Sequence, residues 1–266
     1  MNAQHLITGG ILGACLGSFL NVCAHRSLQG RSWWGNDRSV CESCGHVLGA
    51  LELIPVISWL VLRGRCKNCG ARISVRYLLV EVVCAALAVM ILARWGLSWA
   101  CAIAAVGTCG LVVNSLTDIE SSEVLDLFAI APGVAALILR FAGGKWAVLD
   151  GAAGAFAGWA VFAVIIFLSR GGMGWGDATF MMGMGAVLGW RFTLLAFYCG
   201  IMAGGAWALV LLALGRVKWG RHDALPLVPF LSVGCFVVMM WGPEIFAWLT
   251  HRMHSEIFIV SWPFLE

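Results

Sequence analysis

Long apolar runs separated by short polar segments make up most of this chain. A helix needs about 20 apolar residues to cross the hydrocarbon core of a bilayer, where it satisfies its own backbone hydrogen bonds. The pattern therefore predicts an all-α polytopic membrane protein with about eight transmembrane helices. The expected spans cover residues 6–24, 77–93, 99–117, 127–142, 147–168, 178–190, 193–214 and 225–248.

The composition supports this fold class. Of the 266 residues, 61% are hydrophobic and 12% are charged, and the mean hydropathy is +0.90. A soluble fold of this length would need far more polar surface. No basic residue precedes the first run and no small-residue cleavage site follows it. We therefore expect a retained span rather than a signal peptide.

The lysines and arginines predict the orientation, because cytoplasmic loops carry an excess of basic residues. With the N-terminus outside, the loops between the expected spans place twelve basic residues inside and five outside, and Arg140 is one of the five. Most of the bias comes from one segment, residues 26–76. We therefore expect both termini outside and the 26–76 loop in the cytoplasm.

The 26–76 loop is the only segment that could form a soluble subdomain. It contains two Cys-x-x-Cys pairs with 21 residues between them, and a glycine follows each pair. This spacing favours a tetrahedral zinc site whose four thiolates leave no open position for water, so the metal would be structural. Two disulfides are the alternative, but a cytoplasmic loop is in a reducing compartment. The expected ligands are Cys41, Cys44, Cys66 and Cys69.

Two other features lie in or beside this loop. The apolar piece at residues 51–62 is too short to cross a bilayer, so we expect it at the membrane interface or packed under the cysteine pairs. Glu81 lies one turn into the second span, where Arg72 or Arg76 is the expected partner of its carboxylate.

A glycine-rich turn at residues 171–177 ends in Asp177, between two apolar runs. Its glycines, Gly174 and Gly176 among them, allow a tight turn with positive φ that sets the carboxylate where no regular helix would hold it. Asp118 closes the third apolar run on the same side of the membrane by the expected topology. An acid at the mouth of an apolar span indicates a functional site, although Asp177 as a helix N-cap is the alternative.

The pair Asp118 and Asp177 has the chemistry of an aspartic protease. Two carboxylates that share one site hold one proton, so the ionised member takes a proton from water and the protonated member polarises the scissile carbonyl. Three other acids follow Asp118, and Asp126 is the main rival because it begins the fourth span. We expect Asp126 to face away from Asp177 unless the loop after Asp118 folds back.

With these residues assembled, the chain resembles the type IV prepilin peptidases, membrane aspartic proteases of the Gly-x-Gly-Asp kind. Three departures are found: Leu125 precedes Asp126 where relatives usually have proline, Thr179 stands where lysine is frequent, and Leu78 replaces a proline. The matching motifs are Gly17-Ser18-Phe19-Leu20-Asn21-Val22, the two cysteine pairs, Ile73-Ser74-Val75-Arg76-Tyr77 with Glu81, Thr117-Asp118, Gly174-Trp175-Gly176-Asp177 and Pro226-Leu227-Val228-Pro229-Phe230-Leu231.

The resemblance implies a reaction, substrates and a location. Members of the family cut the basic leader from prepilin or pseudopilin precursors at the cytoplasmic face of the bacterial inner membrane, for pilus assembly or type II secretion. Many also methylate the new N-terminal amine with S-adenosylmethionine, whose binding residues the sequence does not identify. The expected division is a first transmembrane helix (1–25), a cytoplasmic zinc loop domain (26–76) and a transmembrane peptidase domain (77–266). The expected partners are these precursors and membrane lipid, and no nucleic acid.

Two functions of other classes compete with this interpretation. In a proton-coupled transporter, Asp118, Asp177 and Glu81 would form a relay, but both aspartates lie near one face and no inverted repeat is visible. A structural assembly subunit with a zinc loop would leave the glycine-rich turn at Asp177 unexplained.

Overall fold

The structure, a computed structural model, describes residues 2–34, 38–169, 173–215 and 226–251. The described residues are helical with short connections and no named strands, and each of the eight expected spans overlaps a helix. The long helices are α1 (Ala3–Leu28), α3 (Val75–Trp95), α4 (Trp99–Ser121), α5 (Asp126–Arg140), α6 (Gly144–Leu168), α7 (Trp175–Leu188), α8 (Trp190–Ala213) and α9 (Val228–His251). The short ones are η1 (Ala50–Leu53), α2 (Ile57–Val61) and η2 (Phe141–Gly143).

Six stretches of the described residues are long and apolar enough to cross a membrane, and α5 to α6 counts as one stretch of 43 residues. The chain is therefore an all-helical, multi-pass membrane protein. The count of eight spans stays a prediction, because α5 has 15 residues and α7 has 14, fewer than a bilayer crossing usually needs.

The chain forms two compact units, Met1–Gly96 and Leu97–Glu266. In the first unit, α1 packs against α3 through glycines that permit close backbone approach. A Cβ at Gly13 would lie 2.6 Å from the carbonyl oxygen of Cys84, and one at Gly17 would lie 2.7 Å from the Cys84 Cβ. The loop between the two helices belongs to this unit, so the second expected span groups with the N-terminal part of the chain. The division expected from the sequence stays a prediction.

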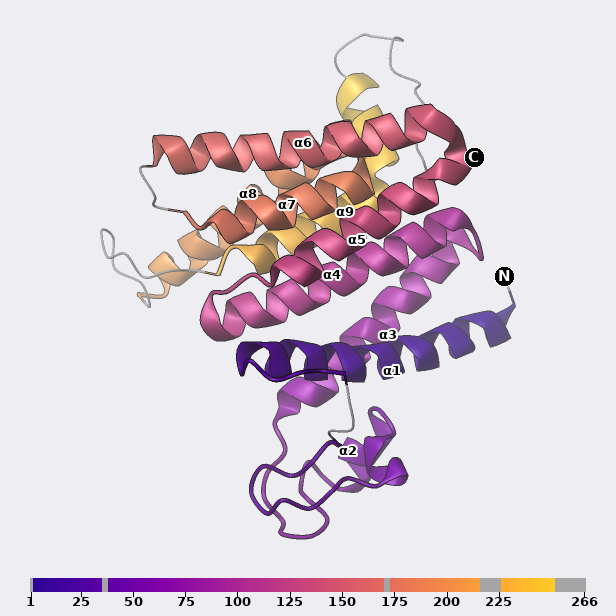
Figure 1. Cartoon of the computed structure of the whole chain (residues 1–266), viewed down its shortest axis with the longest axis vertical. Coiled ribbons are helices and arrows are strands. Elements are labelled where there is room, and N and C mark those ends of the chain that lie inside the picture. The colour runs from indigo at the N-terminus through magenta and orange to yellow at the C-terminus, as the bar shows by residue number, and fades with distance from the viewer. Residues whose placement is uncertain (1, 35–37, 170–172, 216–225, 252–266) are drawn as a thin grey trace. The chain divides into compact units, whose positions relative to one another are not determined.

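In the described part of the second unit, helices α4 to α9 pack as a bundle around α7 (Figure 1). From Ala178 to Leu188 almost every residue of α7 is buried. Small residues allow this burial, since a Cβ at Gly183 would collide with a backbone carbonyl of α5, and one at Gly185 with a backbone carbonyl of α6. The core of the unit therefore consists of the short helix α7 enclosed by longer ones. Asp177 lies at the N-terminal end of α7.

The other end of α7 is held by a buried arginine. Arg140, the last residue of α5, donates to Asp150 Oδ2 at 3.1 Å and to the carbonyl oxygens of Ala147 at 3.0 Å and Val187 at 2.9 Å. The orientation count had treated Arg140 as a loop cation, but its side chain is almost fully buried. Counting lysines and arginines in the loops does not distinguish a solvated arginine from a buried one that joins three helices.

Candidate active site and metal centre

Four helix ends meet at one end of the second unit. There α4 ends, and α5, α7 and α9 begin (Figure 1). Side chains near these termini can reach one another, and backbone N–H groups at helix N-termini lack partners within their own helix. This end carries Asp118 and Asp177.

Asp118 lies in the last turn of α4 and is 7% exposed. Its Oδ2 accepts a hydrogen bond of 2.9 Å from the N–H of Val228, the first residue of α9. The contact is supported one turn earlier, where the Ser115 hydroxyl donates to the Ser232 hydroxyl at 2.8 Å. An N–H at the positive end of a helix stabilises negative charge on the carboxylate.

Asp177 lies in the first turn of α7, inside a regular helix. Gly174 is the N-cap residue, with an extended backbone at φ −77°, and neither Gly174 nor Gly176 has positive φ. The expectation of a positive-φ turn at these two glycines was therefore wrong. The helix N-terminus was correctly considered as the alternative, but its N-cap is Gly174 and not Asp177.

The glycine at position 176 has a packing reason. A Cβ there would lie 2.8 Å from the Cβ of Val124, in the segment before α5. At Gly174 the nearest such atom is the Gly176 backbone nitrogen at 3.9 Å. Only Gly176 therefore needs to be glycine for steric reasons.

Asp118, in the last turn of α4, and Asp177, in the first turn of α7, lie within electrostatic reach of each other. Both are largely withdrawn from water, Asp118 more completely. Two partly desolvated carboxylates within electrostatic reach favour a state that holds a single proton. This arrangement suits proton exchange with a water molecule and a carbonyl group.

Asp126, the rival of Asp118, contacts the same helix as Asp177. The Thr179 hydroxyl lies 3.0 Å from Asp126 Oδ1 and 2.9 Å from the Gly176 carbonyl oxygen. The segment between α4 and α5 therefore brings Asp126 against α7 through Thr179, and whether Asp126 faces Asp177 stays a prediction. The contact joins the first turns of α5 and α7.

Asn114 shapes that segment, and the sequence reasoning gave it no role. Its side chain is fully buried, its Oδ1 accepts from the Leu125 N–H at 2.9 Å, and its Nδ2 donates to the Gly110 carbonyl oxygen at 3.0 Å. An amide one turn before Asp118 in an apolar run was the available signal, since a buried polar side chain needs partners.

The four cysteines of the 26–76 loop gather in the first unit. Their Sγ atoms lie within 4.8 Å of one another, and those of Cys41 and Cys69 are 3.9 Å apart. Tetrahedral zinc with Zn–S bonds of about 2.3 Å has sulfur atoms about 3.8 Å apart. All four are free thiols. Their chemistry and spacing therefore fit a zinc ion.

The two cysteine pairs have the same backbone structure. The N–H of Cys41 donates to the His46 carbonyl oxygen and that of Gly45 to the Cys41 carbonyl oxygen, both at 2.8 Å. The second pair repeats this pattern, with Cys66 bonded to Ala71 at 2.8 Å and Gly70 bonded to Cys66 at 2.9 Å. Gly45 and Gly70 have φ of +69° and +72°, which favours glycine.

Hydrogen bonds to sulfur support the thiolate form of Cys44. The backbone N–H of His46 and the side-chain amide of Asn68 lower its pKa, and Asn68 Nδ2 lies 3.7 Å from Cys44 Sγ. Thiolate is the form that binds metal.

Glu81 has a partner that the sequence did not predict. Its Oε2 accepts from the N–H of Val56 at 2.7 Å. Val56 has φ +62°, a conformation that is strained for a β-branched residue. The buried carboxylate of α3 therefore holds the turn between η1 and α2.

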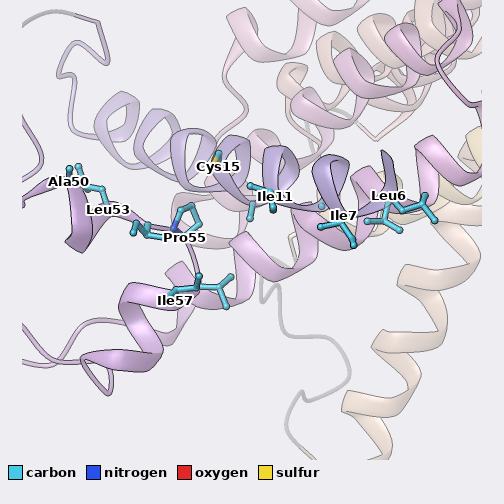
Figure 2. Close-up of a pocket in the computed structure, with 13 residues that line it drawn as sticks. Leu6, Ile7, Ile11, Cys15, Ala50, Leu53, Pro55 and Ile57 are labelled. Atoms are coloured by element: carbon cyan, nitrogen blue, oxygen red, sulfur yellow. The ribbon is translucent and has the colours of Figure 1, made fainter. Parts of the chain in front are cut away.

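The apolar piece between the cysteine pairs forms η1 and α2, and much of its apolar surface is exposed. Beside it is an open apolar hollow of about 840 Å³ between α1, the 50–57 segment and Val89 (Figure 2). Its lining is almost entirely aliphatic, as Leu6, Ile11 and Pro55 illustrate. It offers no acid, base or metal ligand other than the thiol of Cys15.

Comparison with known proteins agrees with the division of the chain into two compact units. Residues 11–95 match the model of the bacterial peptidase A24 N-terminal domain, and residues 105–209 match the model of the type IV leader peptidase family. The first range contains the four cysteines and the second contains both aspartates.

Several relatives named prepilin leader peptidase/N-methyltransferase align over most of the chain. The protein of Pseudomonas putida is 32% identical over 93% of this chain and 94% of its own length. That of Burkholderia pseudomallei (strain 1026b) is 33% identical over 87% and 84%, and that of Aeromonas salmonicida (strain A449) is 29% identical over 88% and 89%. No solved structure matches the chain significantly.

The fold and the comparisons define a multi-pass membrane protein of the peptidase class. The chain belongs to the type IV leader peptidase family, which confirms the resemblance noted in its motifs.

Proposed function

We propose that this chain cuts the basic leader from prepilin or pseudopilin precursors and methylates the new N-terminal amine. The observation that carries the proposal is the pair Asp118 and Asp177, at adjoining helix ends within the range matched by the peptidase family. The names of the relatives support both activities.

The surroundings of the two aspartates favour different roles in peptide hydrolysis. The Val228 N–H stabilises Asp118 as the ionised member, so Asp118 accepts a proton from the attacking water. Asp177 carries the shared proton and polarises the scissile carbonyl. The water oxygen bonds to the carbonyl carbon, the carbon–nitrogen bond then breaks, and the leaving amine takes up a proton.

The four thiolates of Cys41, Cys44, Cys66 and Cys69 would hold one structural zinc ion. A bound ion fixes the loop, because the binding free energy of such sites contributes to folding. With all four positions filled by protein ligands, the ion has no place for substrate or water.

Methylation would use S-adenosylmethionine, as the word N-methyltransferase in the relatives' names supports. When bound, this donor would supply a methyl group to the neutral α-amine, which would lose one proton to solvent. The chemistry requires a pocket for the donor near the cytoplasmic face, where the new amine is produced.

The proposed setting is the bacterial inner membrane, with both termini outside and both reactions at the cytoplasmic face. The excess of basic residues in the 26–76 loop supports this orientation. The partners would be precursors for a type IV pilus or a type II secretion system.

Purified protein in detergent, incubated with a basic-leader precursor and S-adenosylmethionine, tests the proposal by intact mass. We expect loss of the leader, followed by a gain of one methyl group. Asp118→Asn and Asp177→Asn should release no leader, whereas Glu120→Gln, an exposed acid in the same turn of α4, should cut normally. A wild-type protein that leaves the precursor intact would contradict the proposal and favour a transporter.

A further inference from the structure

A polar hollow of about 370 Å³ lies wholly inside the first unit. It is bounded by the C-terminal end of α1, the cysteine-bearing loop and the first turns of α3, and it includes Ser18, Trp59 and Glu81. Its volume falls in the range of small-molecule and cofactor sites. The thiol-bearing residues Cys41 and Cys66 form part of its wall.

Two polar atoms of residues lining this hollow are buried and lack hydrogen-bond partners among the described residues: Glu52 Oε1 and Trp59 Nε1. The other oxygen of Glu52 is already used, because Oε2 accepts from the Gly49 N–H at 2.8 Å and lies 3.2 Å from His46 Nε2. Buried polar groups are nearly always satisfied. One unpaired acceptor and one unpaired donor therefore indicate a ligand that presents both a donor and an acceptor.

The indole of Trp59 is positioned for such a ligand by a glycine. Gly64 has φ +65°, and a Cβ there would lie 2.6 Å from a Trp59 ring carbon. The Trp59 ring thus packs directly against the Gly64 backbone, where any side chain would collide with it. An aromatic face with an N–H at its edge offers both stacking and a directed hydrogen bond.

Charges of both signs line the hollow. Carboxylates come from Glu42, Glu52 and Glu81, and the cations include Arg38 and Arg72. An ordinary anion or cation site carries mainly one sign, whereas this lining suits a molecule that is itself positively and negatively charged. The apolar hollow of Figure 2 lacks such groups and therefore does not compete for this ligand.

We propose that the polar hollow of the first unit binds S-adenosylmethionine, with Glu52 and Trp59 as direct contacts. Glu52 Oε1 accepts from a ribose hydroxyl, and Trp59 donates its N–H to an acceptor of the nucleoside. The lining carboxylates face the sulfonium and ammonium charges, and the arginines face the ligand carboxylate. This assignment rests on the methyl-transfer part of the proposed function.

Binding of S-adenosylhomocysteine, the demethylated product, to the purified full chain tests the site. Trp59→Phe removes the N–H and keeps an aromatic ring, and Glu52→Gln removes the charge at constant size. Each should weaken binding about tenfold or more. Trp59→Phe leaves the ligand acceptor unpaired, and Glu52→Gln turns one of two accepting oxygens into a donor, so either the ribose hydroxyl or the Gly49 N–H loses its acceptor. Trp95→Phe removes a buried indole N–H at the far end of α3, and Glu120→Gln removes a carboxylate of the second unit. Both controls should bind normally.

Bound zinc and leader cleavage are measured on every variant, so a misfolded loop is recognised by lost metal. Photo-crosslinking of an azido-adenosyl analogue to the wild-type chain needs no variant, and the label should map to residues 38–81. Label confined to the second unit, or unchanged binding in both Trp59→Phe and Glu52→Gln, would overturn the site while cleavage and methylation stand. A wild-type protein that cuts precursor but binds no donor would overturn both the site and methylation, leaving the peptidase.

Discussion

At the scale of single residues, Asp118 and Asp177 differ in how their charge is supported. Asp118 accepts a hydrogen bond from the backbone N–H at the start of α9. Asp177 lies in the first turn of α7, just after Gly174 and Gly176. The two carboxylates lie within electrostatic reach, and we expect that neither is replaceable by an amide.

We expect Asp118→Asn and Asp177→Asn each to lower kcat/KM for leader removal by about a thousandfold or more, and the double variant to lose little more, because groups that act as a unit are not additive. The pH profile of wild-type cleavage should be a bell that belongs to the pair. Steady-state cleavage of a purified precursor measures both. Activity retained in Asp118→Asn but lost in Asp126→Asn would move the site to the start of α5.

Glycine 176 and glycine 174 should respond differently to the same change. Gly176→Ala places a Cβ 2.8 Å from the Val124 Cβ, and overpacking of this kind costs about 1–3 kcal/mol. We expect a shifted first turn of α7 and cleavage reduced about tenfold or more. Gly174→Ala meets no atom closer than 3.9 Å and should cut at nearly the wild-type rate. Equal loss in both variants would show that backbone flexibility, and not packing, requires the glycines.

At the scale of elements, a hydrogen bond between α5 and α7 aligns the helix that carries Asp177. Asp126→Asn keeps an oxygen that accepts from Thr179, so most of the cleavage rate should remain. Thr179→Val and Asp126→Ala each remove the bond, whose net contribution is about 1 kcal/mol, and each should slow cleavage a few-fold.

A double-mutant cycle tests this pairing. Because both changes remove the same contact, the combined variant Asp126→Ala with Thr179→Val should be no slower than the slower single variant. Additive losses in kcat/KM would mean that the two side chains act independently.

The cysteine loop should affect one activity more than the other. Cys41→Ser with Cys66→Ser removes two of four ligands and so should abolish bound metal. Cys41 and Cys66 also line the polar hollow, so methylation of a pre-cut substrate should fall to background. Cleavage should persist, because both aspartates lie in the other compact unit. Metal analysis with intact mass measures all three, and one zinc per chain in this variant would refute the ligand assignment.

At the scale of the whole molecule, the sequence predicted what depends on local patterns. The length of each apolar run located its helix, and the two Cys-x-x-Cys spacings anticipated the clustered thiols. The partners of Asp126, Glu81 and Arg140 were not predicted, because each contact joins segments whose proximity depends on helix packing. The identity of a charged residue shows that it needs a partner, but only the packing determines which one.

The orientation of the chain remains a prediction with a direct test. Alkaline phosphatase fused after Glu266 should be active, since that enzyme works only outside the cytoplasm, and the same reporter inserted at Gln29 should be inactive. The reason is the cluster of basic residues between residues 26 and 76. The reverse pattern would place the cysteine loop outside and favour disulfides there.

The buried Arg140 has a consequence for how the protein is made. A cation in an apolar surrounding is unfavourable, and the partner of Arg140, Asp150, follows ten residues later, in α6. Arg140 and Asp150 are therefore synthesised within one helical hairpin, α5 and α6. This hairpin can leave the translocon with the two charges already paired. The Val187 carbonyl arrives only with α7. Synthesis thus first neutralises this corner of the bundle and then fixes it to the helix that carries Asp177.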